Sequence, residues 1–395
     1  MSTELLTEHS PLMKTYNRFP ITLEKGKGSY VWDQEGNKYL DFTSGIATCN
    51  LGHLPDVVKK QVDAQLEKLW HCSNLYHIPE QEALAELLVK HSCGDQVFFC
   101  NSGAEANEAA IKLARRYARE VKGKEEAFEI VTFNQSFHGR TMATLSATGQ
   151  PKLQDGFAPM LQGFRHLPFN DVQALNQLPS DKTCAVLVEL VQGEGGVNPA
   201  DVEWMQQLED ICNANDILLM VDEIQTGMGR TGTLFAYEQY GIDPDVISVA
   251  KGLGSGFPIG AIISKAKVAE AFGPGTHGST FGGNPLASSA GFATVNHLVS
   301  SDVINEAFIL GHYLKDQLEQ LKAEFNEVKE VRGKGFLLGM EISGQAISIL
   351  EKAREKNVLI LVAGPNVVRI LPPLTTTKEE IDYFVGVLKE IFEGA

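Results

Sequence analysis

Several motifs that mark common protein classes are missing from this sequence. Its six cysteines and ten histidines form neither a CxxC pair nor an HExxH motif, so no metal site is predicted. There is no GxxxxGK[ST] phosphate loop, and GLGSG at residues 252–256 falls short of a full GxGxxG. No GxSxG motif supports a serine nucleophile. These absences argue against a metalloenzyme, a nucleotide-binding loop and a serine hydrolase.

Positive charge and long apolar runs are also scarce. The 34 lysines and arginines face 50 acidic residues, giving a net charge of −16, which argues against nucleic acid or an anionic membrane as partner. No stretch approaches the length of apolar chain that crosses a bilayer, and the start lacks a cationic region followed by an apolar core. Scattered, unpaired cysteines are typical of a reducing compartment. We therefore expect a soluble cytoplasmic protein.

The 395 residues, 43% of them hydrophobic, are enough for a large core and more than one domain. From about residue 80, short apolar strands alternate with helical patterns, which predicts an α/β fold with a mostly parallel sheet buried on both faces. The expected strands are 96–100, 129–133, 184–190, 217–221, 246–250 and 260–264, and the helices between them include 80–91, 103–121 and 201–214.

The pattern changes after about residue 302. A long amphipathic helix (302–327) leads into strand-like segments at 335–342 and 367–371, and a last helix begins at Lys378. We expect a large α/β domain at residues 45–301, and a smaller α+β domain formed by residues 1–44 together with residues 302–395. Residues 28–42 are predicted to form two strands around a turn at Asp33–Asn37.

Ligands of open parallel sheets bind outside the carboxyl ends of the strands, so polar residues there are candidates for function. The strand at 96–100 runs into Ser102, Gly103 and Ala104, which open a helix with an alanine-rich stripe. The free N–H groups of such a helix start favour an anion. The alternative is a simple capping box, with Ser102 paired with Glu105.

Asp222 and Lys251 each follow an apolar strand, at 217–221 and 246–250. A buried carboxylate needs a partner, and the amides of the loop TGMGRTG could supply one. Lys251 could likewise be an ordinary lysine leaving the core. If both side chains share an edge with the helix start at Ser102, they suit pyridoxal 5′-phosphate. The phosphate would lie at the helix start, the aldehyde on the lysine, and the ring nitrogen on the aspartate.

Two arginines could bind carboxylates. Phe137 and Arg140 follow the strand at 129–133, where an aromatic ring could stack on a flat cofactor and an arginine could clamp a carboxylate. Phe137 could equally belong to the core. Arg369 lies within an apolar strand, so it needs a partner, for which Glu194 is one candidate. A purely structural ion pair is the alternative.

Seven segments together resemble one family, the class III (ornithine-type) pyridoxal-phosphate aminotransferases, from about Gly28 to the carboxyl end. They are NSGAEANEAAIKLAR, SFHGRT, VQGEGG, VDEIQTGMGRTG, AKGLGSGFPIGA, GSTFGGNPLA and VVRILPPL. The resemblance implies the fold-type I architecture, with a large domain containing a seven-stranded type of sheet and a smaller domain. It also implies a homodimer with shared active sites.

The resemblance further implies roles for individual residues. Lys251 and Asp222 would be catalytic. The cofactor would be held by Ser102, Gly103, Ala104, Phe137, Asp222, Glu223, Ile224, Gln225 and Lys251, and by Thr280 of the neighbouring subunit. Substrates would be bound by Arg140, Ser279, Arg369, Glu194 and Glu189. Glu194 would cover Arg369 with one substrate and move aside for the dicarboxylate.

Within the family, the sequence looks most like the members that transfer the terminal amino group of N2-acetyl-L-ornithine to 2-oxoglutarate, in arginine biosynthesis. A sibling activity on ornithine, succinylornithine or 4-aminobutyrate is the nearest alternative. A non-catalytic protein that keeps fold and cofactor is a second. A nicotinamide oxidoreductase is a third, although the dinucleotide motif is missing.

Overall fold

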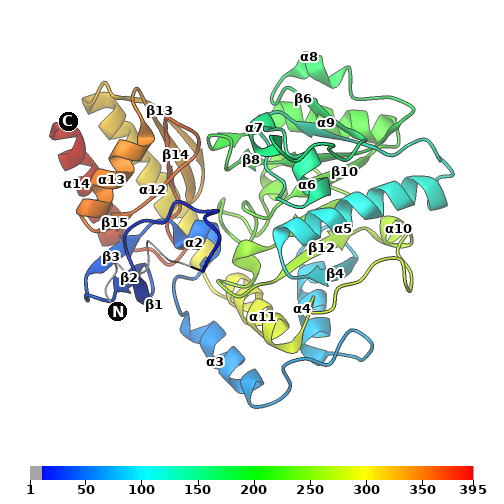
Figure 1. The fold of residues 1–395 in the computed structure, drawn as a ribbon, viewed down its shortest axis with the longest axis horizontal. Helices are drawn as coiled ribbons and strands as arrows, with labels where there is room; N and C mark the ends of the chain where they lie inside the picture. Colours follow the sequence, from blue (N-terminus) through cyan, green and yellow to red (C-terminus); the bar gives the residue numbers. More distant parts are fainter. Residues whose placement is uncertain (1–10, 395) are drawn as a thin grey trace.

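The computed structural model describes residues 11–394, so residues 1–10 of the expected small domain lie outside the described residues. Figure 1 shows two lobes, one built around a large sheet and one that contains both the first and the last strands and helices of the described chain. Among the described residues, no helix is long and apolar enough to cross a membrane.

The large sheet has seven strands in the order β4-β12-β11-β10-β7-β5-β6. Their bounds are β4 (Gln96–Cys100), β12 (Gly260–Ser264), β11 (Val246–Val249), β10 (Leu218–Asp222), β7 (Thr183–Glu189), β5 (Glu129–Phe133) and β6 (Phe164–Leu167). All pairs are parallel except those of β12, which runs antiparallel to both neighbours. The predicted α/β class and mostly parallel sheet are confirmed.

Both faces of this sheet are buried, which explains its continuous apolar strands. In β7, Ala185 and Leu187 face one core cluster, whereas Val186 and Val188 face another. Helix α5 (Gly103–Arg116) covers the first face with its alanine stripe and contacts β11 and β12. Small side chains let the helix lie close to the sheet. The predicted helix 103–121 ends in a π-helical turn at Tyr117–Val121.

Figure 1 labels the remaining helices of this part of the chain, of which α3 (Asp56–Leu66) lies away from the large sheet. The others are α4 (Pro79–Lys90), α6 (Met142–Ala147), α7 (Pro151–Gln154), α8 (Val172–Leu175), α9 (Val202–Ala214), α10 (Ala266–Ala269) and α11 (Pro285–Ser300), with the strand pair β8 (Val191–Gln192) and β9 (Asn198–Pro199). Helix α11 packs against α3 and α4.

The second lobe brings strands near the start of the described chain together with strands from its last hundred residues. One sheet has the order β1-β2-β3-β15, and its β3–β15 pair is parallel. The other has the order β13-β14-β17-β16. The strands are β1 (Leu23–Lys27), β2 (Tyr30–Asp33), β3 (Lys38–Asp41), β13 (Val328–Lys334), β14 (Leu337–Ile342), β15 (Val358–Leu359), β16 (Leu361–Val362) and β17 (Val367–Ile370).

Helices α12 (Val303–Glu324) and α13 (Ala346–Glu355) pack on these sheets, and α14 (Lys378–Glu393) packs against both helices. The short α2 (Ser44–Ala47) follows β3. The sequence pattern correctly predicted two strands, β2 and β3, around the turn at Asp33–Asn37, but it did not predict β13. The pairing of β3 with β15 supports the division into residues 45–301 against 1–44 and 302–395, which stays a prediction.

An ion pair fixes the segment after β3. His53 Nε2 lies 2.7 Å from Asp41 Oδ2, and this hydrogen bond raises the pKa of His53 to about 10. A raised histidine pKa stabilises the fold fully below the unfolded value of 6.5, and the stabilisation is lost as pH rises through the folded value.

Replacing His53 with glutamine should therefore lower the free energy of unfolding more below pH 6.5 than above pH 10. Urea unfolding at several pH values measures this difference. His166→Gln is the matched control, because burial lowers the pKa of His166, and its replacement should not be more costly in acid. If the loss of unfolding free energy in His53→Gln does not change with pH, the ion pair does not contribute to stability and the prediction is wrong.

Candidate active site

A cavity of about 460 Å³ opens where the strands of the large sheet end. This volume is within the range that suits a small-molecule ligand. Many of the residues predicted from the sequence line it: Ser102, Gly103, Ala104, Phe137, Arg140, Glu189, Glu194, Asp222, Ile224, Gln225 and Lys251. They come from the ends of β4, β5, β7, β10 and β11, because parallel strands bring their carboxyl ends to one edge.

The register of the sheet places the acidic and basic groups together. Asp222 pairs with Glu189 of β7 on one side and with Ser248 of β11 on the other. Lys251 follows three residues after Ser248. Because β12 returns antiparallel beside β11, the loop between them stays at this edge and carries Lys251 into the cavity wall.

One wall is the start of α5. Ser102 is the N-cap of this helix, and its hydroxyl accepts a hydrogen bond from Glu105 N at 3.2 Å. Glu105 does not complete the capping box, because its carboxylate accepts from Asn101 N at 2.7 Å instead. The first N–H groups of a helix have no partner within it, and the positive end of its dipole favours an anion. This wall can therefore bind a phosphate.

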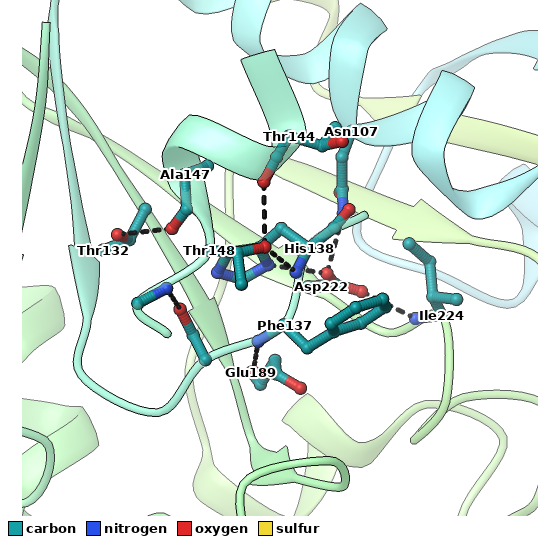
Figure 2. Close-up of polar contacts among 12 residues, drawn as sticks. Asn107, Thr132, Phe137, His138, Thr144, Ala147, Thr148, Glu189, Asp222 and Ile224 are labelled. Carbon is teal, nitrogen blue, oxygen red and sulfur yellow. Dashed lines mark hydrogen bonds and ion pairs between the residues drawn. The ribbon is translucent and has the colours of Figure 1, made fainter. Parts of the chain in front are cut away.

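Asp222 is buried and held by two side chains that the sequence analysis did not single out. Its Oδ2 accepts from Asn107 Nδ2 and from His138 Nδ1, both at 2.8 Å, and Oδ1 accepts from Ile224 N at 3.1 Å (Figure 2). The alternative of loop amides in TGMGRTG was wrong, since the partners are on α5 and after β5. These bonds fix the orientation of the carboxylate.

Lys251 adopts an unusual backbone conformation, with φ of +42°. A non-glycine residue in this region carries strain, which is concentrated at functional sites. Burial lowers the pKa of Lys251, partly offset by the negative charge of Glu194. A lowered pKa increases the share of neutral, nucleophilic amine at neutral pH.

Glu189 contributes a buried carboxyl group at the same edge. Burial and the neighbouring charge of Asp222 raise the pKa of Glu189 well above its usual value. Its Oε2 accepts a hydrogen bond from Phe137 N at 2.8 Å, which ties down the loop that carries the aromatic ring (Figure 2).

Arg369 reaches the cavity region from β17 and pairs with Glu194. Its Nη1 lies 2.5 Å from Glu194 Oε1, and it also donates to Gly193 O at 3.0 Å and to Gln225 Oε1 at 3.4 Å. Burial alone would raise the pKa of Glu194, but the charge of Arg369 outweighs it and the pKa is lowered. The Arg369 side chain is 3% exposed and is held by three hydrogen bonds, whereas that of Glu194 is 29% exposed and therefore only half-buried.

Other predicted residues lie at the rim or away from the cavity. Arg140 is exposed, with its guanidinium 5.7 Å from the centre of the Phe137 ring. Ser279 Oγ accepts from Asn101 Nδ2 at 3.1 Å, which places it beside a lining residue. Thr280 is exposed, and its expected contact from a neighbouring subunit stays a prediction. Glu223 does not line the cavity, because its buried carboxylate binds Thr226 Oγ1 and Tyr237 N.

These residues fit a phosphorylated pyridine aldehyde. The cavity combines an anion-binding helix start, an amine with a lowered pKa and an immobilised carboxylate. The wall is also shaped for close packing, since a Cβ added to Gly103 would lie 2.8 Å from Ile224 Cδ1. Within residues 11–394 there is no cluster of three or more His, Cys, Asp or Glu that could hold a metal ion.

Two site residues, Asn107 and His138, were missed by the analysis of the sequence. Asn107 is fully buried on the alanine-rich face of α5, and its Nδ2 also donates to His138 O at 2.8 Å. A lone amide within an apolar stripe was the available signal, because a buried polar group needs partners. His138 is adjacent to Phe137 in a motif already recognised, but nothing local shows that it faces Asp222.

The fold and the site define an aminotransferase. The model of the family "Aminotransferase class-III" matches residues 12–392, and the chain belongs to this family. The acetylornithine aminotransferase of Oceanobacillus iheyensis is 59% identical over 97% of this chain and 96% of its own length. That of Bacillus subtilis is 52% identical over 96% of this chain and 97% of its own.

Solved structures are similar over nearly the whole chain. The ornithine aminotransferase of Toxoplasma gondii has a TM-score of 0.95 at 32% identity, covering 100% of this chain and 96% of that one. The N-acetylornithine aminotransferase of Stenotrophomonas maltophilia has a TM-score of 0.83 at 39% identity, covering 95% and 96%.

The cofactor follows from the family. The Toxoplasma gondii ornithine aminotransferase, crystallised in the presence of oxidized glutathione, holds pyridoxal phosphate at its active site in partial occupancy; it is 32% identical, with a TM-score of 0.93, over 97% of this chain and 92% of that one. Class III aminotransferases use this cofactor, so this chain is a pyridoxal-phosphate-dependent transferase of amino groups.

Proposed function

We propose that this chain transfers the terminal amino group of N2-acetyl-L-ornithine to 2-oxoglutarate, giving N-acetyl-L-glutamate 5-semialdehyde and L-glutamate. The observation that carries the proposal is the Arg369–Glu194 pair at the edge of a cavity that also contains Lys251 and Arg140. Relatives 46–59% identical over almost the whole chain, each named acetylornithine aminotransferase, support the choice of donor. The reaction belongs to arginine biosynthesis.

Different residues of the cavity would bind the phosphate, the ring and the aldehyde of the cofactor. The start of α5 at Ser102, Gly103 and Ala104 would bind the phosphate, and Asp222 would bind the ring nitrogen. Phe137 and Ile224 would contact the two faces of the ring, Gln225 the ring hydroxyl, and Lys251 the aldehyde. When bound, pyridoxal phosphate supplies an aldehyde that exchanges amines and a ring that withdraws electrons from the carbon bearing the amine.

The chain's own residues then hold the substrates and move protons. The neutral amine of Lys251, once free, would take a proton from the substrate carbon and return it to the cofactor carbon as general base and acid. Asp222 would keep the ring nitrogen protonated, with its orientation fixed by His138 and Asn107. The two substrates would react in turn, in a ping-pong sequence.

The arginine–glutamate pair would let one cavity accept two differently charged substrates. Arg140 would bind the α-carboxylate of the donor, with Ser279 near the substrate and Glu189 supporting the region. Glu194 would neutralise Arg369 while the acylated donor is bound. The buried arginine stays in place, so movement of the more exposed glutamate would free it for one carboxylate group on 2-oxoglutarate.

We also propose a cytoplasmic homodimer in which Thr280 of the partner subunit completes the phosphate site, and a division into a large domain (45–301) and a small domain (1–44 and 302–395). Phe281, next to Thr280, and Met142, two residues after Arg140, are exposed apolar residues, which supports a partner that covers them.

A second donor class is favoured by one observation, the TM-score of 0.95 to an ornithine aminotransferase. A comparison of kcat/KM for acetylornithine, ornithine, succinylornithine and 4-aminobutyrate, each with 2-oxoglutarate, distinguishes the candidates. We expect acetylornithine to exceed ornithine and 4-aminobutyrate by about tenfold or more, because contacts to an extra group are worth about 1–3 kcal/mol. A higher value for ornithine would contradict the proposed donor, and no turnover at all would contradict the reaction.

A further inference from the structure

Arg230 is buried where the two lobes meet, and it has no carboxylate partner among the residues that the structure describes. Its side chain is 0% exposed. Nη2 donates to Asn50 Oδ1 at 2.8 Å, and Nη1 donates to Phe336 O at 3.3 Å and to Pro372 O. None of these acceptors is charged, and burial lowers the pKa of Arg230 to about 10. A buried charge without a counter-ion costs free energy, so the presence of Arg230 at this place needs an explanation, which its hydrogen bonds provide.

The acceptors belong to three segments that are distant in the sequence. Arg230 lies in the loop that begins after Asp222, Asn50 follows α2, and Phe336 and Pro372 belong to the sheet of the second lobe or its continuation. The backbone repeats the contact, since Phe336 N donates to Arg230 O at 2.9 Å. One planar guanidinium therefore joins three parts of the fold, which a point charge could not do with the same geometry. The contacts of Arg230 with Asn50, Phe336 and Pro372 form a junction between the lobes.

Asn50 connects this junction to the catalytic lysine. Its Nδ2 donates to Met228 O at 2.6 Å, and its own carbonyl accepts from Leu374 N at 2.7 Å. The side chain packs against Gly252, where an added Cβ would lie only 2.2 Å from Asn50 Nδ2. Gly252 is the residue next to Lys251, so the position of Asn50 limits the position of the lysine loop.

Pro372 extends the junction to the substrate arginine. It lies three residues after Arg369, at the end of the segment that follows β17. The intervening Leu371 is held as well, since its N donates to Phe42 O at 2.8 Å and its O accepts from Ser44 Oγ at 2.6 Å. Arg230 thus contacts, directly or through Asn50, the segments that carry both Lys251 and Arg369.

We propose that Arg230 and Asn50 are positioning residues that fix Arg369 relative to Lys251 and thereby set the affinity for the dicarboxylate substrate. This inference rests on the proposed function, in which Arg369 receives one carboxylate group from 2-oxoglutarate. A dicarboxylate must contact both ends of the cavity at once. Its binding affinity should therefore depend more strongly on the spacing of the two lobes than the rate of the reaction at Lys251 does.

The test uses the holoenzyme and the variants Arg230→Lys and Asn50→Ala. Arg165→Lys is the control, because Arg165 also donates to backbone carbonyls, of Gln177 and Leu178, but lies in the outer strand β6 and pairs with Glu129 at 2.9 Å. The Kd of glutarate, a dicarboxylate that cannot react, is measured by calorimetry. The Michaelis constants for the dicarboxylate substrate and for the amino donor are measured beside it, together with kcat and Tm.

We expect both variants to raise the Kd of glutarate and the Michaelis constant for the dicarboxylate substrate by about tenfold, with a smaller change in kcat. The reason is that a small displacement of Arg369 strongly weakens the binding of a ligand that is held at both ends. The control should lose Tm without this change. If both constants are unchanged in variants that have lost Tm, the junction is only structural and the inference is overturned.

If Arg230→Lys does not fold, Asn50→Ala and Gly252→Ala are used to test the inference. The Cβ that is added in Gly252→Ala displaces the Asn50 side chain. Wild-type enzyme without transaminase activity would contradict the proposed function instead. If an active wild type binds no glutarate, the Michaelis constant for the dicarboxylate substrate decides, and an unchanged constant in the variants overturns the inference. An active wild type with insensitive variants contradicts the positioning role alone.

Discussion

Replacing Lys251 with alanine is expected to lower kcat for transamination by about 10³-fold or more, because both the covalent attachment and the proton transfer at one carbon depend on this amine. The fold should persist, since Lys251 lies in a loop at the cavity wall and has no ion pair among the described residues. Single-turnover measurements with amino donor and a large excess of pyridoxal phosphate give the rate.

Lys265→Ala is the matched control. Lys265 also follows a strand of the large sheet, but its amine pairs with Asp243 at 2.9 Å and does not line the cavity. Borohydride reduction followed by mass spectrometry adds a readout independent of turnover. The wild type and the control should retain the mass of the cofactor on the peptide with residue 251, and Lys251→Ala should not. Near-normal turnover in pure Lys251→Ala would mean that another group is the catalyst.

The class of fold was predictable because the strands of the large sheet are buried on both faces. Strands such as β7, in which each of the seven residues is buried, give continuous apolar runs that the sequence displays directly. The reversed direction of β12 was not predictable, because a strand that returns antiparallel has the same composition as a parallel one. Strand β13 was missed since its residues alternate irregularly between buried and exposed positions, and the helix before it ends at Glu324 rather than at residue 327.

Much of the cavity wall could be predicted from strand ends, because parallel topology brings them together whatever lies between. Contacts across the sheet were different. Asn107 and His138 bind Asp222 from 115 and 84 residues away, and only the packing of α5 and of the loop after β5 determines those contacts. Arg230 was likewise not singled out within TGMGRTG, because nothing in the local sequence shows that its side chain is fully buried.

Replacing Asp222 with asparagine is expected to lower kcat by about 10²- to 10³-fold while the cofactor still binds, because a fixed charge beside the ring nitrogen is lost but the size of the side chain is kept. The hydrogen bonds from His138 and Asn107 can still be accepted by the amide oxygen, whereas the bond from Ile224 N to the other oxygen is lost, so the cavity should keep most of its shape. The pH titration of the bound cofactor's absorbance measures whether the ring nitrogen is still protonated.

The strongest form of this experiment removes the carboxylate and restores the charge on the ring. In Asp222→Ala, a pyridoxal phosphate analogue methylated on its ring nitrogen should recover part of the activity that the natural cofactor loses, because the nitrogen is then permanently positive. Asp245→Asn is the matched control: this carboxylate is also buried, directly before β11, where it accepts from Leu219 N at 3.1 Å and pairs with Lys267 at 2.8 Å. It lies outside the cavity lining, so its loss should lower Tm and leave kcat nearly unchanged. An Asp222→Asn enzyme as active as this control would show that the ring needs no charge from residue 222, and the network of Asn107 and His138 would then stabilise the fold rather than the reaction.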